Sequence, residues 1–153
     1  MKHIGNAAVL DELVERLGQL TPDATPRWGA FSAPEMLAHL GDAGDAVLGR
    51  RTPPGVTPDN RLPLPVKWLM LYSRMPFPKG VETREGVDPK RGGSRPGDFA
   101  GDRIRVIDGL RSLAIAAPDG VAPTHFRFGS MSLRGWHHWA YKHSDHHLRQ
   151  FGL

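Results

Sequence analysis

Two histidines near the end of the chain are spaced so that both can bind one metal ion. His143 and His147 lie four residues apart, on a stripe that starts at Trp136 and Ala140 and reaches Gln150 at spacings of three and four. On a helix these side chains share one face, and residues four apart have Cβ atoms about 5–6 Å apart. Both imidazoles can therefore reach the same ion, which is why H-x-x-x-H recurs on metal-binding helices. Because the chain has 8 His residues, the pair alone is a weak signal.

A third histidine comes from a second predicted helix. His39 lies between Met36 and Leu40 on the apolar side of its segment. Three inward imidazoles from two helices would form one face of a coordination sphere and leave open positions for water or substrate, as catalytic sites do. The alternative is that His39 is a hydrogen-bonded core residue and that His143 and His147 line a polar seam. For the three together we predict a metal site, with His39, His143 and His147 as ligands.

Other polar residues nearby have weaker patterns. Asp42, one turn after His39, and Asp145 are candidates to orient an imidazole, although a solvated helix carboxylate is the commoner role. Gln150 is predicted to hydrogen-bond to water or to a ligand beside the metal; the alternative is an ordinary polar residue near the chain end. Three histidines of the last helix lie off the apolar stripe and are expected at the surface: His137, His138 and His146. If the helix is rotated from the predicted orientation, His146 could replace His147 as a ligand.

The two predicted helices that must position these residues have recognisable capping residues at their ends. Ser32-Ala33-Pro34-Glu35 is a capping box with Pro inside the first turn, and it predicts a helix over residues 33–50. Ser132 is a good N-cap and Gly152 a typical helix stop, so the last helix is predicted over residues 132–150. These two helices carry all three candidate ligands.

The remaining segments also indicate an all-α fold. Apolar residues recur every three or four positions over residues 6–20 and 102–117, and a shorter helix is expected over residues 65–75. Residues 76–101 are rich in Pro and Gly and show no period, so we expect a long loop that forms a lid or site wall, or else a plain surface excursion. No convincing strand alternation is present. We predict a four-helix bundle with a short extra helix and this long loop.

Composition limits the function classes further. The 153 residues fit one domain, residues 1–153. The absence of cysteine excludes disulfides, iron–sulfur clusters and thiolate zinc sites. No apolar run is long enough to span a membrane and no signal segment starts the chain, so we expect a cytoplasmic protein with no membrane partner. The net charge of +4 favours anionic ligands weakly, but no basic helix face is present, so no nucleic-acid partner is expected.

The histidine pattern resembles that of the DinB superfamily, whose helical motif reads H-x-x-x-H-x-x-Q. Here His39 on the second predicted helix is followed by His143-x-x-x-His147-x-x-Gln150. Further stretches are similar to one uncharacterised branch of that superfamily: Arg27-Trp28-Gly29, Ser32-x-x-x-Met36-Leu37-x-His39-Leu40-Gly41-Asp42, Lys67-Trp68, Met75-Pro76-x-Pro78-Lys79-Gly80, Gly129-x-Met131-Ser132 and Asp145-His146-His147-Leu148-x-Gln150-Phe151-Gly152. The resemblance therefore covers nearly the whole chain from Arg27 onwards.

The resemblance implies an up-down-down-up four-helix bundle in which His39, His143 and His147 bind a divalent ion such as nickel, zinc or iron. Some characterised relatives are transferases that attach a low-molecular-weight thiol, such as bacillithiol, mycothiol or glutathione, to electrophilic substrates. Relatives of this fold are often dimers, so a homodimer is implied as well. The chain departs from the commonest pattern in having Leu148-Arg149 where Arg-Gly often follows the last histidine, and in its long Pro/Gly loop.

These observations lead to two hypotheses about function. The first is a metal-dependent hydrolase or thiol transferase that acts on a small-molecule substrate, with water or a low-molecular-weight thiol activated at the metal. The second is a non-catalytic helical bundle that binds a ligand or partner, with a structural or vestigial histidine cluster.

Overall fold

The structure, a computed structural model, describes residues 1–52, 61–122 and 124–153, and about half of these residues are helical. Four long helices and one short helix make up the fold: α1 (Ala7–Gln19), α2 (Ala33–Val47), α3 (Leu64–Tyr72), α4 (Phe99–Ala114) and α5 (Leu133–Gln150). A single 3-10 turn, η2 (Pro118–Gly120), and two short strands, β1 (Thr124–His125) and β2 (Gly129–Ser130), connect α4 to α5.

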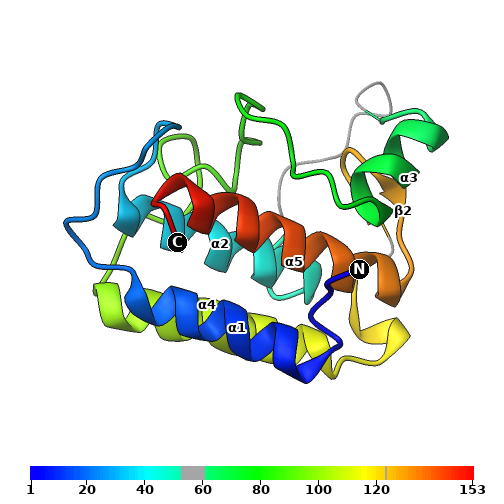
Figure 1. The fold of residues 1–153 in the computed structure, drawn as a ribbon, viewed down its shortest axis with the longest axis horizontal. Helices are drawn as coiled ribbons and strands as arrows, with labels where there is room; N and C mark the ends of the chain where they lie inside the picture. The colour runs from blue at the N-terminus through cyan, green and yellow to red at the C-terminus, as the bar shows by residue number, and fades with distance from the viewer. Residues whose placement is uncertain (53–60, 123) are drawn as a thin grey trace.

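The four long helices form a bundle with the direction pattern up-down-down-up. In Figure 1, α1 and α5 run one way, and α2 and α4 run the opposite way. α2 packs mainly on α4, α1 contacts both α4 and α5, and α3 lies against α5 outside the bundle. The predicted helical-bundle fold, with its short extra helix, is therefore confirmed.

The helix ends follow the capping chemistry of the sequence. The backbone N–H of Ser32 donates to the Glu35 carboxylate at 2.9 Å, and the Glu35 N–H donates to the Ser32 hydroxyl at 3.4 Å, which completes the predicted capping box. α4 begins at Phe99, three residues before the predicted start, because the Asp98 carboxylate accepts the Gly101 N–H at 2.8 Å and caps the helix there. α5 ends as predicted before Gly152, whose φ of 82° suits a residue without Cβ.

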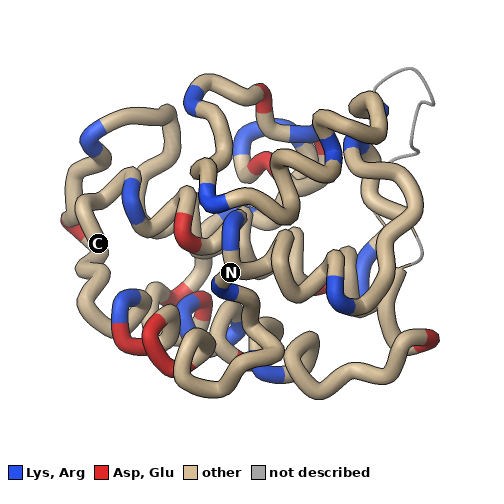
Figure 2. The backbone as a smooth tube through the Cα atoms, turned by 45° about the vertical axis from the view of Figure 1, so that its right-hand side comes forward, with Lys and Arg blue, Asp and Glu red and all other residues tan. Residues whose placement is uncertain are grey.

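The core draws on every helix. Leu13 and Leu17 of α1, Leu37 of α2, Leu71 of α3 and Leu148 of α5 are all fully buried, so the short α3 also contributes to the core. None of the helices that the structure describes is long and apolar enough to cross a membrane. Lys and Arg positions are spread over several elements and interspersed with Asp and Glu (Figure 2).

A two-residue antiparallel hairpin, β1 with β2, was not predicted, because strands this short cannot show an alternating pattern. It buries His125, whose Nδ1 accepts the backbone N–H groups of Arg127 and Phe128 at 3.0 and 3.2 Å. Burial, followed by the charges of Arg84 and Arg127, lowers the pKa of His125 to about 3. His125 is therefore neutral in the folded protein at neutral pH.

The neutral state of His125 makes stability depend on pH. Its pKa is about 3 when folded and near 6.5 when unfolded, so the unfolded chain binds an extra proton below pH 6.5. The stabilisation from this residue is complete above pH 6.5 and is lost as the pH falls towards 3. His125→Asn offers an oxygen to the same two N–H groups but does not titrate. We expect the unfolding free energy of this variant to fall less steeply below pH 6, by up to about 1.4 kcal/mol per pH unit, in urea titrations. Equal slopes for the variant and the wild type would contradict a neutral buried His125.

Candidate metal centre

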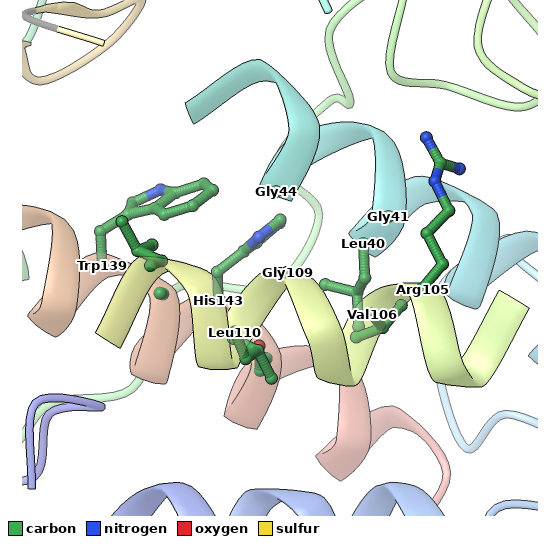
Figure 3. Close-up of a pocket in the computed structure, with 12 residues that line it drawn as sticks. Leu40, Gly41, Gly44, Arg105, Val106, Gly109, Leu110, Trp139 and His143 are labelled. Atoms are coloured by element: carbon green, nitrogen blue, oxygen red, sulfur yellow. The ribbon is translucent and has the colours of Figure 1, made fainter. Parts of the chain in front are cut away.

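His39 of α2 and His143 and His147 of α5 converge in the bundle. One ring nitrogen from each lies within 4.8 Å of the other two, and the ring centroids are 4.8 to 5.0 Å apart. His39 and His147 are buried, with 5% and 7% of their surfaces exposed. Figure 3 shows His143 pointing towards α2 beside Trp139. The structure therefore brings together the three residues that the sequence singles out as ligands; that they bind a metal stays a prediction.

The convergence follows from the apolar faces of the two helices. Trp136 and Ala140 are buried on the stripe that carries the α5 histidines, and Met36 and Leu40 are buried on either side of His39. Folding buries both stripes in the same core, and the imidazoles are carried in with them. The Trp139 ring stacks on His143 at 4.7 Å, so one side of the cluster is covered by an aromatic ring.

Two hydrogen bonds set the orientation of the imidazoles. The Nδ1–H of His39 donates to the Val87 carbonyl at 2.7 Å, and the Nδ1–H of His147 donates to the Gln150 side-chain oxygen at 2.8 Å. A proton held at Nδ1 leaves the lone pair on Nε2, the usual arrangement of a metal-ligating histidine. His39 and His147 are thus prepared as Nε2 ligands.

The nitrogen spacing fits a shared ion. The Nε2 atoms of His39 and His143 are 3.1 Å apart. Two nitrogens bound at about 2.1 Å to one ion are about 3.0 Å apart in octahedral geometry and about 3.4 Å apart in tetrahedral geometry. The observed distance lies in that range, and it also suits a direct hydrogen bond between the two imidazoles. The residues present can therefore hold a divalent ion, although this distance alone does not require one.

Burial keeps the cluster neutral. It is the largest cause that lowers the pKa of His143 and of His147 well below 6.5, and the neighbouring imidazoles lower both further. Burial also lowers the pKa of His39, although the Val87 carbonyl and the charge of Asp42 act in the opposite direction. Three neutral imidazoles at neutral pH offer lone pairs to a cation without competing protons.

The loop between α3 and α4 supplies one wall of this site through Val87. Asp42 of α2, which is fully buried, fastens that loop: its carboxylate accepts the Ser94 backbone N–H at 2.6 Å, the Ser94 hydroxyl at 2.7 Å and the Arg105 guanidinium at 2.8 Å. Burial opposes ionisation of Asp42, but these hydrogen bonds outweigh it and lower the pKa. The expectations that Asp42 orients an imidazole or faces solvent are therefore wrong. The contact of Val87 was not predicted, because every residue has a backbone carbonyl and the residue type does not show which one accepts a hydrogen bond.

The expectation that the other α5 histidines lie at the surface is wrong for His138, which is 2% exposed. The start of the chain covers this side of α5, and the His138 Nδ1–H donates to the Lys2 carbonyl at 3.3 Å. The Tyr72 ring of α3 packs edge-on against His138 at 5.1 Å. His137 is half-buried and donates to the Leu113 carbonyl at 3.0 Å. Packing of the chain start and of α3 thus buries a face of α5 that the bundle alone would leave open.

The remaining candidates have other roles. Asp145 forms an ion pair with Arg16 at 2.9 Å and does not orient an imidazole. His146 is half-buried and is not among the three residues that converge, so the alternative ligand is not supported. Gln150 contacts His147 directly; its contact with water or a ligand stays a prediction.

The comparisons with known proteins agree with the motif. A sequence model of the DinB superfamily matches residues 5–151. No curated protein matches the chain, and no solved structure matches it. The match spans all five helices and the three converging histidines.

The Gln150 contact gives a first test of the site. Replacing Gln150 by Leu removes the acceptor that holds the His147 proton at Nδ1, so we expect zinc or nickel affinity to fall about 10- to 100-fold while the fold is retained. Gln150→Glu keeps an acceptor oxygen and should restore most of the affinity. Calorimetric titration with each metal measures the effect, and circular dichroism checks the fold. Equal affinities for Gln150→Leu and the wild type would show that this contact does not support the site.

The Asp42 network gives a second test. Asp42→Asn removes the buried charge that binds Arg105 and Ser94, so we expect the free energy of unfolding to fall by about 3 kcal/mol and the loop of residues 73–98 to be cleaved faster in limited proteolysis. Asp45 is a matched control, because it pairs with the same Arg105 at 2.6 Å but has a side chain that is 19% exposed. Asp45→Asn should cost about 1 kcal/mol or less. A larger effect at Asp45 than at Asp42 would overturn this account of the loop.

Proposed function

The chain belongs to the DinB superfamily, and on that premise we propose that it is a metal-dependent enzyme whose three imidazoles bind a divalent ion. The observation that carries the proposal is the convergence of His39, His143 and His147, two of them oriented through Nδ1. Nitrogen ligands of this kind suit nickel, zinc or iron.

A divalent ion here would act as a Lewis acid, lowering the pKa of water or of a low-molecular-weight thiol so that an anionic nucleophile is available near neutral pH. The protein contributes neutral ligands that leave the charge of the ion uncompensated, and aromatic side chains that limit water around them. Phe31 lies 5.4 Å from the His39 ring and Trp139 lies 4.7 Å from the His143 ring. We propose hydrolysis, or transfer of a thiol such as bacillithiol, mycothiol or glutathione, on a small electrophilic substrate.

One observation favours a second candidate function, a non-catalytic bundle that binds a ligand or partner. The 3.1 Å between the Nε2 atoms of His39 and His143 allows a direct hydrogen bond, which would satisfy both nitrogens without an ion. The histidines would then serve as a polar core. The two functions differ in metal content, so that is the first quantity to measure.

Elemental analysis of protein purified without a His tag or added metal should find a nearly stoichiometric divalent metal. We expect it to be lost in His39→Ala and in His143→Ala, each checked for its fold by circular dichroism, because two imidazoles bind an ion far less tightly than three. His146→Gln is the matched control, since His146 is next to His147 on α5 but outside the cluster, and its metal content should equal that of the wild type. A wild type without metal that takes up none on reconstitution would refute the metal site and leave the non-catalytic bundle.

Activity is measured separately from metal content. The metal-loaded wild type should accelerate either hydrolysis or thiol addition to a panel of electrophiles, and the His39→Ala and His143→Ala variants should lose this rate. Metal bound at one equivalent with no rate on any substrate would support metal binding but not catalysis.

A further inference from the structure

A groove lies on the side of α5 next to the metal centre, where no function is yet assigned. Its volume is about 410 Å³, and it is bounded by α5, by the end of α3 with the segment that follows it, and by the turn before α2. We call it the Trp28 groove; its lining includes Trp28, Met70, Phe77, Lys79, His146 and Arg149. The volume lies in the usual range of small-molecule pockets, about 300–1,000 Å³.

The walls of the Trp28 groove are largely aromatic and apolar. The Trp28 ring meets the His146 ring edge-on at 4.8 Å, and the Phe77 ring lies 6.4 Å from His146 on another side. The other apolar side chains of the lining are those of Leu69, Met70, Met75, Pro76 and Pro78. A flat apolar body would gain contact with two aromatic rings and displace water from these surfaces.

The polar groups of the groove are positively charged. The Lys79 ammonium lies 4.8 Å above the Trp28 ring, and among the described residues it forms no ion pair. The Arg149 guanidinium is 3.9 Å from the Asp145 carboxylate, too far for a hydrogen bond, and its side chain is 51% exposed. No Asp or Glu belongs to the lining of the groove. An anionic group placed here would meet two cations, and the one carboxylate that pairs with either of them, Asp145, lies 3.9 Å from Arg149 and outside the lining.

We propose that the Trp28 groove binds an amphipathic anion, a molecule with a planar apolar body and one carboxylate, sulfonate or phosphate held by Lys79 and Arg149. The proposal does not depend on the metal, because none of the three candidate ligands lines the groove. His146, which is half-buried, and Arg149, which is exposed, lie on a different side of α5 from His143 and His147.

The test uses two fluorescent probes with similar ring systems. 8-Anilinonaphthalene-1-sulfonate carries the anion, and N-phenyl-1-naphthylamine lacks it. We expect the sulfonate to bind with one-to-one stoichiometry, and Lys79→Gln or Arg149→Gln to weaken it about three- to tenfold while the neutral probe is unaffected. Arg111→Gln is the matched control, an exposed arginine on α4 away from the groove, and it should bind both probes like the wild type. Equal sulfonate affinity in all variants would overturn the proposal.

A second readout locates the bound probe. In NMR spectra the ring protons of His146, assigned with His146→Gln, should shift on addition of the sulfonate, because His146 lines the groove. Shifts confined to residues of the exposed apolar side of α3, which includes Trp68 at 63% exposed, would place the probe elsewhere and overturn the proposal. The near-UV circular dichroism spectrum must stay unchanged, since loss of tertiary packing also increases binding of this dye.

Discussion

The structure depends on one constraint: three imidazoles packed into an apolar core, two of them buried, need partners for their nitrogens. His39 obtains its partner from the Val87 carbonyl of the long loop, and His147 obtains its partner from Gln150, one turn later on the same helix. The loop itself is held by the buried carboxylate of Asp42. The irregular segment between α3 and α4 is therefore part of the site, because its Val87 carbonyl accepts the Nδ1–H of His39.

Several arginines of this protein form ion pairs with carboxylates of the same chain. Arg51 and Arg105 both lie near the fully buried Asp42, at 3.5 and 2.8 Å, and Arg105 also bonds to Asp45. Arg91 pairs with Asp88 in the same loop. The first role of these arginines is therefore to neutralise carboxylates. The Trp28 groove differs, because Lys79 forms no ion pair among the described residues, and Arg149 has only the 3.9 Å pair with Asp145.

Local signals in the sequence predicted the helices and the convergence of the ligands. The cap at Ser32 and the stripe through His143 and His147 each involve residues of a single helix. Such local patterns can be recognised in the sequence alone. The burial of His138, the role of Asp42 and the contact of Val87 depend on segments far apart in the chain. The helical period shows which side of α5 is apolar. It does not show that the start of the chain and α3 cover a second side, which carries His138. The match to the DinB superfamily supports the fold, while the reaction has to be argued from the residues.

Helix geometry ties the two candidate sites together. Successive residues of a helix are rotated by about 100°, so His146 and His147 point in different directions, one to the Trp28 groove and one to the metal centre. Their ring centroids are nevertheless only 5.3 Å apart. Gln150, which holds His147, also lies against the turn that carries Trp28, since a Cβ at Gly29 would be 2.6 Å from its amide nitrogen. The backbone of that turn and the Gln150 side chain are in contact, and glycine at position 29, with φ of 93°, leaves the space for it. The turn that carries Trp28 and the candidate metal centre are therefore connected through Gln150, which contacts Gly29 on one side and His147 on the other.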